Sequence, residues 1–363
     1  MKKKIIFFCP SIEIGGVEKN LYKVVNFFSS KNEDVSLITF NKKRFQKKFN
    51  KKVKVISNNF LCKFNFPYFI KTLLCIIYYF FKYGFQKDLI LVSFQSNLYF
   101  ILLAKLTRNK IVARSNAAPN YYVSNQFKQK FFQLIYNLAD KVIVNSNEFK
   151  NIFFKTFKVM PILIYNPAFN KSKAKSFRKI KKFKKNKIIK FLNVGRLTYQ
   201  KNQMIILQAL CKINYLNYKL IIIGNGTEEE NLKKYILLNN LQNKVQILKN
   251  ISDASKYFKK CDAFILSSKF EGLPNVLIEA QIMKKFILSS KCPTGPSEIL
   301  MNGRAGYLFR NNDYKDLKNK IQKFVLKINK SEIKNKIKIG YKNLYRFDEK
   351  KNLEKYYKEI ITL

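Results

Sequence analysis

Short apolar runs alternate with longer segments of helical pattern along nearly the whole chain, and this alternation limits the fold more than any other feature. In the first half, runs rich in β-branched and aromatic residues lie at residues 5–9, 35–40, 89–94, 110–114 and 141–145. The pattern resumes at residues 188–194, 218–224, 245–248, 262–268 and 285–290. Strands separated by helix-length segments are typical of βαβ units in a parallel sheet. The sequence therefore predicts an α/β fold with two doubly wound, Rossmann-like domains.

A basic segment, KSKAKSFRKIKKFKKNKIIK, separates the two sets of predicted strands and has the composition of a linker. From it we predict an N-terminal domain at residues 1–170, a linker at 171–186 and a second domain at 187–345. Residues 346–363 are expected to end in an amphipathic helix that packs back on the first domain. Because open α/β sheets bind ligands at the carboxyl ends of their strands, the two domains are expected to face a cleft.

The chain is strongly basic, with 71 Lys and Arg against 22 Asp and Glu and a formal net charge of +49. Such a charge suits nucleic acid or an anionic membrane surface. A compositional bias toward lysine explains it equally well, because the lysines are scattered and do not gather on one periodic face. The content of 47% hydrophobic residues is enough to form buried cores and excludes a disordered polycation.

Histidine is absent from the sequence. This excludes Ser-His-Asp triads, Cys-His pairs and metals held by histidine. The six cysteines show no CxxC spacing and indicate reduced, buried thiols of a cytosolic protein. The first apolar run is too short for a signal peptide, and the longest uncharged apolar stretch, residues 72–81, is too short to span a bilayer. We therefore expect neither a signal peptide nor a transmembrane helix.

Two loops that follow predicted strands carry residues suited to binding an anion. Gly15 and Gly16 follow the first strand, where they let the backbone approach a ligand and the next helix offers N–H groups. A plain tight turn is the alternative. Gly195, Arg196 and Lys201 follow the first strand of the second half, and an arginine fork with a lysine charge suits a diphosphate. In so lysine-rich a chain, chance is the alternative for Lys201.

Two glutamates flank the start of a predicted helix in the segment FEGLPNVLIEAQ. Pro274 suits the first turn of this helix, which places Glu271 in the preceding loop and Glu279 about a turn and a half inside. The two carboxylates then reach different parts of one elongated ligand, with the N–H groups of Asn275 and Val276 between them. The alternative is a solvated Glu271 and a Glu279 paired with a lysine.

The order of these motifs resembles that of glycosyltransferase family 4, the retaining sugar-nucleotide transferases with the GT-B fold. The features that carry the resemblance are the Gly-Gly loop, ADKVIVNS, YNP, NVGRLTYQKN, IIGNG, EGLPNVLIEA and GPSEIL, which span nearly the whole chain. The resemblance implies a GT-B fold whose C-terminal helix closes back toward the first domain. It also implies a role in making bacterial surface polysaccharide or lipid-linked oligosaccharide.

The resemblance further implies roles for individual residues. Glu279 would hold the ribose hydroxyls of the nucleotide, and Glu271 would position the transferred sugar. Arg196 and Lys201 would neutralise the diphosphate and act as the main electrostatic catalysts in a front-face reaction. No metal cofactor is implied, because two cations and a helix N-terminus do the work of a divalent ion. Further donor-binding residues would be Gly16, Gly195, Asn275 and Val276.

One departure from the family concerns a histidine that many members carry in a loop of the N-terminal domain. This chain has none. The corresponding segment is ARSNAAP, where Arg114 and Asn116 follow a predicted strand. We take Arg114 and Asn116 as candidate active-site residues, and the alternative is a helix cap.

The implied function is transfer of a hexose or N-acetylhexosamine from a nucleoside diphosphate sugar, most simply a UDP-sugar, to a saccharide or lipid-linked acceptor. Residues 60–87 mix large apolar side chains with lysines, so they form either a helix lying on an anionic bilayer or a core helix. We expect a peripheral protein on the cytoplasmic face of the inner membrane. The alternatives are a GT-B enzyme such as an epimerase and a nucleic-acid-binding protein, which leaves the glycine loops unexplained.

Overall fold

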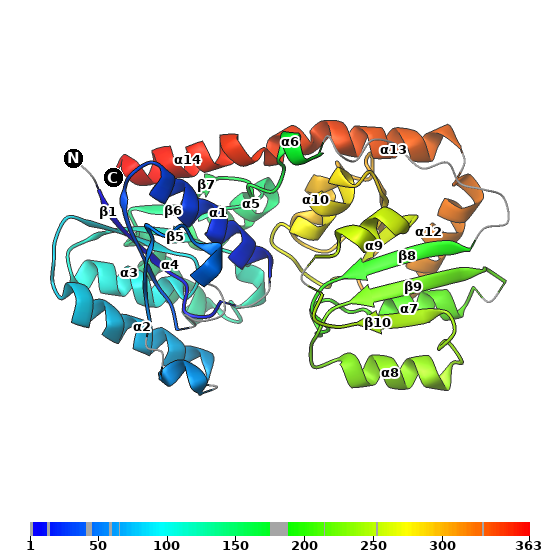
Figure 1. The fold of residues 1–363 in the computed structure, drawn as a ribbon, viewed down its shortest axis with the longest axis horizontal. Coiled ribbons are helices and arrows are strands. Elements are labelled where there is room, and N and C mark those ends of the chain that lie inside the picture. Colours follow the sequence, from blue (N-terminus) through cyan, green and yellow to red (C-terminus); the bar gives the residue numbers. More distant parts are fainter. Residues whose placement is uncertain are drawn as a thin grey trace. The chain divides into compact units, whose positions relative to one another are not determined.

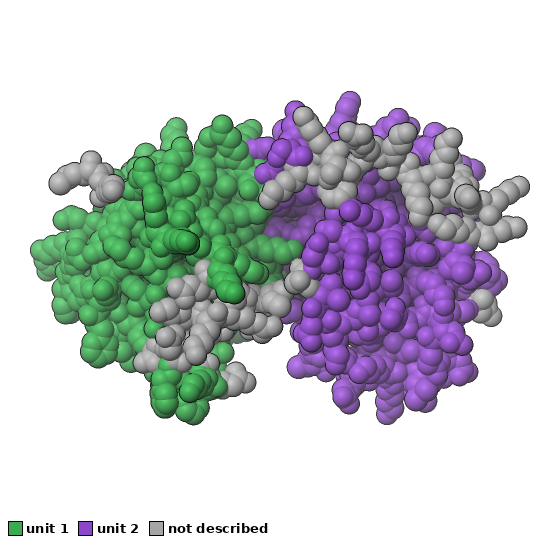
Figure 2. Space-filling view, viewed as in Figure 1, with its two compact units in different colours: residues 1–167, 349–363 green, residues 168–348 purple. Residues whose placement is uncertain are grey.

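The computed structural model describes residues 3–12, 15–40, 46–57, 60–64, 66–174, 188–213, 215–251, 253–328 and 330–363. The chain divides into two compact units (Figure 2). Unit 1 comprises Met1–Pro167 with Glu349–Leu363, and unit 2 comprises Ala168–Asp348. Most of the predicted linker at 171–186 lies outside the described residues, and the predicted domain limits stay a prediction.

Unit 1 is built on a parallel sheet with the strand order β3-β2-β1-β4-β5-β6-β7 (Figure 1). Its central strands are apolar runs buried on both faces, as expected for a parallel sheet covered by helices on both sides. The strands are β1 (Lys4–Phe8), β2 (Asp34–Ile38), β3 (Lys54–Ile56), β4 (Leu89–Ser93), β5 (Lys110–Arg114), β6 (Lys141–Val144) and β7 (Ile162–Leu163).

Two helix layers cover this sheet. Ile5 and Phe7 of β1 pack with α1 and α14, whereas the alternate residues Ile6 and Phe8 pack with α2, α3, α4 and α5. Helix α14 is thus part of unit 1, on the same face as α1 (Figure 1). The helices are α1 (Gly16–Ser30), α2 (Tyr68–Tyr83), α3 (Asn97–Leu106), α4 (Gln126–Asn137), α5 (Asn147–Phe157) and α14 (Glu349–Ile361), with short 3-10 turns at Gln46–Lys48, Leu61–Lys63 and Pro119–Tyr121.

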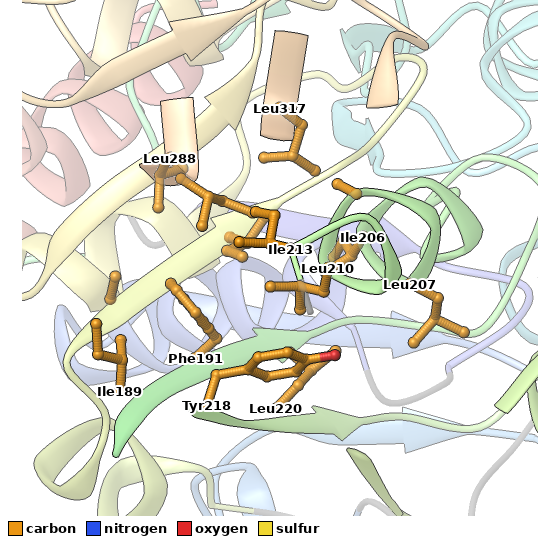
Figure 3. Close-up of a cluster of buried hydrophobic side chains, with 14 of the residues drawn as sticks. Ile189, Phe191, Ile206, Leu207, Leu210, Ile213, Tyr218, Leu220, Leu288 and Leu317 are labelled. Carbon is orange, nitrogen blue, oxygen red and sulfur yellow. The ribbon is translucent and has the colours of Figure 1, made fainter. Parts of the chain in front are cut away.

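Unit 2 is built on a second parallel sheet, with the order β10-β9-β8-β11-β12-β13. Figure 3 shows its core, where Phe191 and Tyr218 of neighbouring strands meet Leu210 of α7. The strands are β8 (Ile189–Val194), β9 (Tyr218–Ile223), β10 (Val245–Leu248), β11 (Ala263–Leu266), β12 (Phe286–Ser290) and β13 (Tyr307–Phe309). The helices are α6 (Lys171–Ala174), α7 (Met204–Cys211), α8 (Glu229–Leu238), α9 (Ser255–Lys260), α10 (Asn275–Ile282), α11 (Pro296–Ile299), α12 (Tyr314–Lys327) and α13 (Ser331–Lys342), followed by a 3-10 turn at Asn343–Phe347.

The predicted α/β fold with two Rossmann-like parallel sheets is confirmed, and every predicted apolar run contains a strand. Three strands were not predicted, namely β3, β7 and β13, which have only two or three residues each and lie at sheet edges. Such short edge strands carry too few residues to show a period.

The described part of the chain contains no helix that is long and apolar enough to cross a membrane. Among the cysteine side chains that the structure describes, Cys9, Cys75, Cys261 and Cys292 are buried free thiols, and Cys211 is partly buried. The prediction of buried thiols is confirmed for Cys9, Cys75, Cys261 and Cys292.

Candidate functional site

Glu271 is the buried centre of a group of polar contacts in unit 2. Its side chain is only 8% exposed, and its Oε1 accepts hydrogen bonds from Lys201 Nζ, in an ion pair, and from Ser268 Oγ at 2.6 Å. Its main chain is also held, because Thr294 Oγ1 donates to its carbonyl at 2.8 Å. The alternative of a solvated Glu271 is therefore wrong.

The ion pair joins two loops that are far apart in the sequence. Strands β8 and β11 are parallel neighbours, so their carboxyl ends meet at one edge of the sheet. The loop after β8 carries Lys201, and the loop after β11 carries Glu271. Gln200 Nε2 donates to the carbonyl of Phe270 at 2.9 Å, and Ser267 Oγ donates to the carbonyl of Lys201 at 2.8 Å. These bonds fix both loops and hold the lysine against the glutamate.

The glycine loop after β9 packs directly on the loop after β8. A Cβ at Gly224 would lie 1.9 Å from the carbonyl oxygen of Gly195, so only glycine fits there. The backbone N–H of Leu197 donates to the carbonyl of Asn225 at 2.8 Å. The IIGNG motif thus supports the loop that presents Arg196 and Lys201.

The GPSEIL segment packs on the loop that carries Glu271. Gly295 has φ +85°, and a Cβ there would lie 2.3 Å from the carbonyl oxygen of Gly272. Thr294 Oγ1 also lies 3.1 Å from that oxygen. A side chain at position 295 would push the two loops apart, which explains the glycine in the GPSEIL segment.

Helix α10 begins at Asn275, directly after Pro274, as the sequence predicts. A proline side chain cannot cap the amides of the first turn, so those of Asn275 and Val276 are not bound by a capping side chain at that position. Glu279 lies about one turn further along the helix and is half-buried. In the sequence, Glu271 thus precedes the first residue of α10, and Glu279 follows it.

Arg196 lies in the same loop as Lys201, and its side chain is exposed. The loop backbone is fixed at this point, because Gln203 Nε2 donates to the carbonyl of Arg196 at 3.0 Å. Gly195 precedes it and packs against the aliphatic part of Lys201, with the lysine Cδ 3.6 Å from a Cβ built at Gly195. Unit 2 therefore brings four of the predicted residues into two joined loops, namely Gly195, Arg196, Lys201 and Glu271.

Arg114 has a different environment in unit 1. Its side chain is 1% exposed, Nε donates to Tyr356 Oη at 2.7 Å, and Nη2 donates to Asn166 Oδ1 at 2.9 Å. Nη1 donates to Asn116 Oδ1, and the guanidinium lies over the Phe94 ring at 5.0 Å. Arg114 therefore ties β5 to the YNP segment and to α14.

Asn116 shares this internal role, because its amide also donates to the Phe94 carbonyl. Neither Arg114 nor Asn116 caps a helix, since the nearby 3-10 turn begins at Pro119 after Ala118. The helix-cap alternative is thus wrong. That the two residues contact substrate stays a prediction.

Gly16 is the first residue of α1, and Glu13 and Ile14 of the preceding loop lie outside the described residues. The buried Glu18 carboxylate lies over Gly15, where a Cβ would be 2.5 Å from its Oε2. Burial, and then the charge of Glu18, raises the pKa of the neighbouring Cys9 thiol well above its usual value. This thiol therefore stays protonated.

Sequence reasoning missed the residues that orient Glu271. Ser268 and Thr294 are completely buried, yet a serine after a strand and a threonine before a glycine give no pattern in the sequence. Within the described residues, no three His, Cys, Asp or Glu side chains gather as metal ligands would. That the reaction needs no metal stays a prediction.

Comparisons with known proteins show which proteins this chain is similar to. Residues 172–339 match the family model described as glycosyl transferases group 1. An uncharacterized glycosyltransferase of Methanocaldococcus jannaschii is 35% identical over 182 residues, which cover 47% of this chain and 44% of that protein. The chain spans about half the length of the first curated relatives that it matches, 44% and 57%.

One relative aligns over most of both chains. It is the Campylobacter jejuni GalNAc-alpha-(1->4)-GalNAc-alpha-(1->3)-diNAcBac-PP-undecaprenol alpha-1,4-N-acetyl-D-galactosaminyltransferase, 26% identical over 331 residues, with 88% of each chain covered. The crystal structure of Anabaena HepE in complex with UDP and glucose superposes with a TM-score of 0.77 at 18% identity, covering 99% of this chain and all of that one. At this identity the likeness shows the fold. Residues 172–339 therefore match the group 1 glycosyl transferase model, and the chain has the GT-B fold.

Proposed function

We propose that the protein is a retaining glycosyltransferase of family 4. It transfers a hexose or N-acetylhexosamine from a UDP-sugar to a lipid-linked saccharide in surface glycan biosynthesis. The observation that carries the proposal is the buried pair of Lys201 and Glu271, held in the joined loops that also present Arg196. The undecaprenol-linked substrate in the name of the Campylobacter relative and the UDP and glucose bound by HepE support the classes of acceptor and donor.

The charges of these loops suit a sugar diphosphate. A lysine ammonium has three donors, of which Lys201 gives one to Glu271, so two remain for phosphate oxygens. Arg196 adds a planar fork that binds two oxygens at once. Because the loops are held by hydrogen bonds and by the close approach at Gly224, the backbone that carries both cations is fixed before the donor binds.

In the proposed reaction, the bond between the anomeric carbon and the diphosphate oxygen breaks, while a bond to the acceptor oxygen forms on the same face of the sugar. A diphosphate oxygen takes the proton of the acceptor hydroxyl. Arg196 and Lys201 stabilise the negative charge that grows on the leaving diphosphate. Glu271 positions the hydroxyls of the transferred sugar and is not a general acid.

The rest of the proposed donor site rests on the resemblance of the sequence motifs. We assign Glu279 to the ribose hydroxyls, and the amides of Asn275, Val276 and Gly16 to the diphosphate. No metal takes part in this proposal. We further propose a peripheral protein at the cytoplasmic face of the inner membrane, with no nucleic acid partner.

A panel of sugar nucleotides tests the proposal. Thermal unfolding and transfer to a lipid-linked saccharide are measured with UDP-Glc, UDP-Gal, UDP-GlcNAc, UDP-GalNAc and GDP-Man, each with and without EDTA. One UDP-sugar should raise the unfolding temperature and give a product whose anomeric configuration, measured by NMR, is that of the donor. An inverted product, or conversion of the donor to its epimer without any acceptor, would overturn the proposal.

A further inference from the structure

Three helices of unit 1 expose large apolar side chains in stripes. On α2 the stripe recurs every fourth residue, and Phe81 within it is 89% exposed. On α4 it includes Phe127, which is 83% exposed. We call the following residues the apolar face: Phe69, Leu73, Ile77 and Phe81 of α2, Tyr99, Leu102 and Leu106 of α3, and Phe127, Phe131, Leu134 and Leu138 at α4. Their spacing places each set along one side of its helix.

The three stripes belong to one layer of the unit. Helix α3 packs against both α2 and α4. The opposite sides of the same helices bury Cys75, Phe100 and Tyr136 in one core cluster on the sheet. Figure 1 shows the three helices in unit 1. Since their inner sides face this common core, the exposed stripes lie on the outer side of the helix layer.

The opposite helix layer of the same sheet shows that chain composition does not explain this exposure. The exposed residues of α14 between positions 350 and 358 are Lys350, Lys351, Glu354, Lys355 and Lys358, all of them charged. A chain rich in phenylalanine and lysine thus keeps aromatic side chains off one layer and presents them on the other. A soluble monomer rarely exposes so many apolar side chains on one layer without a partner.

Charge identifies the partner. The sequences of α2, α3 and α4 contain no acidic residue and five lysines: Lys71, Lys82, Lys105, Lys128 and Lys130. The next acidic residues, Asp88 and Asp140, directly precede strands β4 and β6, and Asp140 is paired with Lys105 and Lys110. A second copy of the chain would bring lysines against lysines. An anionic lipid surface instead accepts both the lysines and the apolar side chains.

We propose that the apolar face docks on an anionic bilayer. The phenylalanines of α2 and α4 enter the boundary between headgroups and acyl chains, while the lysines contact lipid phosphates. This inference deepens the membrane association in the proposed function and rests on it for the choice of a cytoplasmic leaflet. The evidence for membrane docking is the set of exposed side chains. An experiment can therefore refute membrane docking without refuting glycosyl transfer, and the reverse.

Tryptophan fluorescence tests the contact directly, because the chain contains no tryptophan. Phe81→Trp places a single reporter on the apolar face, and Leu238→Trp places one at a residue of unit 2 that is 71% exposed. With vesicles of phosphatidylcholine and phosphatidylglycerol, emission of the Phe81→Trp variant should shift to the blue and be quenched by brominated acyl chains. The Leu238→Trp variant should not respond. An equal response, or none in either variant, overturns the proposal.

Vesicle sedimentation separates the apolar contribution from the net charge of +49. The double variant Phe81→Ser with Phe127→Ser should partition at least about tenfold more weakly than wild type. The control, Leu237→Ser with Leu238→Ser, removes two exposed leucines from α8 and should bind as wild type. Equal binding of all three overturns the proposal, as does a wild-type dimer that the Phe81→Ser, Phe127→Ser variant dissociates. Sugar transfer to a water-soluble acceptor should be unchanged in the Phe81→Ser, Phe127→Ser variant. A loss of this transfer would mean that the variant is misfolded.

Discussion

Each unit of the molecule has an arginine where a parallel strand ends, and the two arginines have opposite environments. Arg114 ends β5 of unit 1 and is 1% exposed, with three neutral acceptors around its guanidinium. Arg196 follows β8 of unit 2 and is exposed. The comparison teaches that the burial of a strand-end arginine depends on what later segments of the chain bring to it.

The source of the acceptors explains the difference. For Arg114 they include Tyr356, which lies 242 residues later in the chain, on the helix that returns to unit 1. In unit 2 the loops are instead fixed by main-chain contacts, such as those of Gly224 and Gly295, and by the ion pair of Lys201 with Glu271. In unit 1 the guanidinium of Arg114 therefore stabilises the fold. In unit 2 the side chain of Arg196 stays at the surface.

The largest expected effect comes from breaking the ion pair of unit 2. Lys201→Met leaves the carboxylate of Glu271 buried without its cation, which should lower the free energy of unfolding by about 3–5 kcal/mol. Urea denaturation followed by circular dichroism measures this loss. Sugar transfer should fall in the same variant, because the proposed function assigns Lys201 to the diphosphate.

A second variant separates the two roles of Lys201. Lys201→Met with Glu271→Gln removes both charges, so most of the lost stability should return while transfer stays low. If the single variant unfolds at the wild-type urea concentration, the pair contributes nothing to the fold of unit 2. The statement that this ion pair fixes the loops of unit 2, as the contacts of Arg114 fix unit 1, would then be wrong.

The next effect concerns the exposed arginine. Arg196→Ala should lower the transfer rate by about 10² to 10³, because the charge growing on the diphosphate loses a donor. The unfolding temperature should stay as in wild type, since the side chain is exposed. The matched control is Arg310→Ala, which removes an arginine that follows β13 of the same sheet and is 76% exposed. Equal rate losses in both variants would refute a specific role for Arg196.

The buried arginine of unit 1 is tested by Arg114→Lys. Arg114→Lys keeps the charge but replaces a fork of donors by one ammonium, so it cannot bind Tyr356, Asn116 and Asn166 in the same way. Unfilled buried acceptors should cost about 1–3 kcal/mol in the free energy of unfolding. Arg108→Lys, at an exposed position after α3, is the control and should cost nothing. Loss of transfer without loss of stability would instead favour the predicted active-site role of Arg114.

The fold was predictable from the sequence because the central strands are long apolar runs, such as β4, in which every residue is buried. The edge strand β7, with two residues, could not show a pattern. The candidates Lys201 and Glu271 were also predictable, since each follows a strand. Their pairing was not, because it depends on β8 and β11 being neighbours in the sheet although the residues lie 70 positions apart.

The smallest expected effect comes from Ser268, whose neutral hydroxyl holds the Glu271 carboxylate. Its hydroxyl donates to Oε1 at 2.6 Å, so we expect it to be a positioning residue for this carboxylate, which the proposed function assigns to the transferred sugar. Ser268→Ala should raise the KM for the donor sugar nucleotide about tenfold and leave kcat within a few-fold. Ser290→Ala is the matched control, because the Ser290 hydroxyl donates at 2.7 Å to the Ser268 carbonyl and not to the carboxylate. Ser290→Ala should lower the free energy of unfolding slightly without changing KM. Equal KM values in the two variants would mean that Ser268 has a role in packing alone.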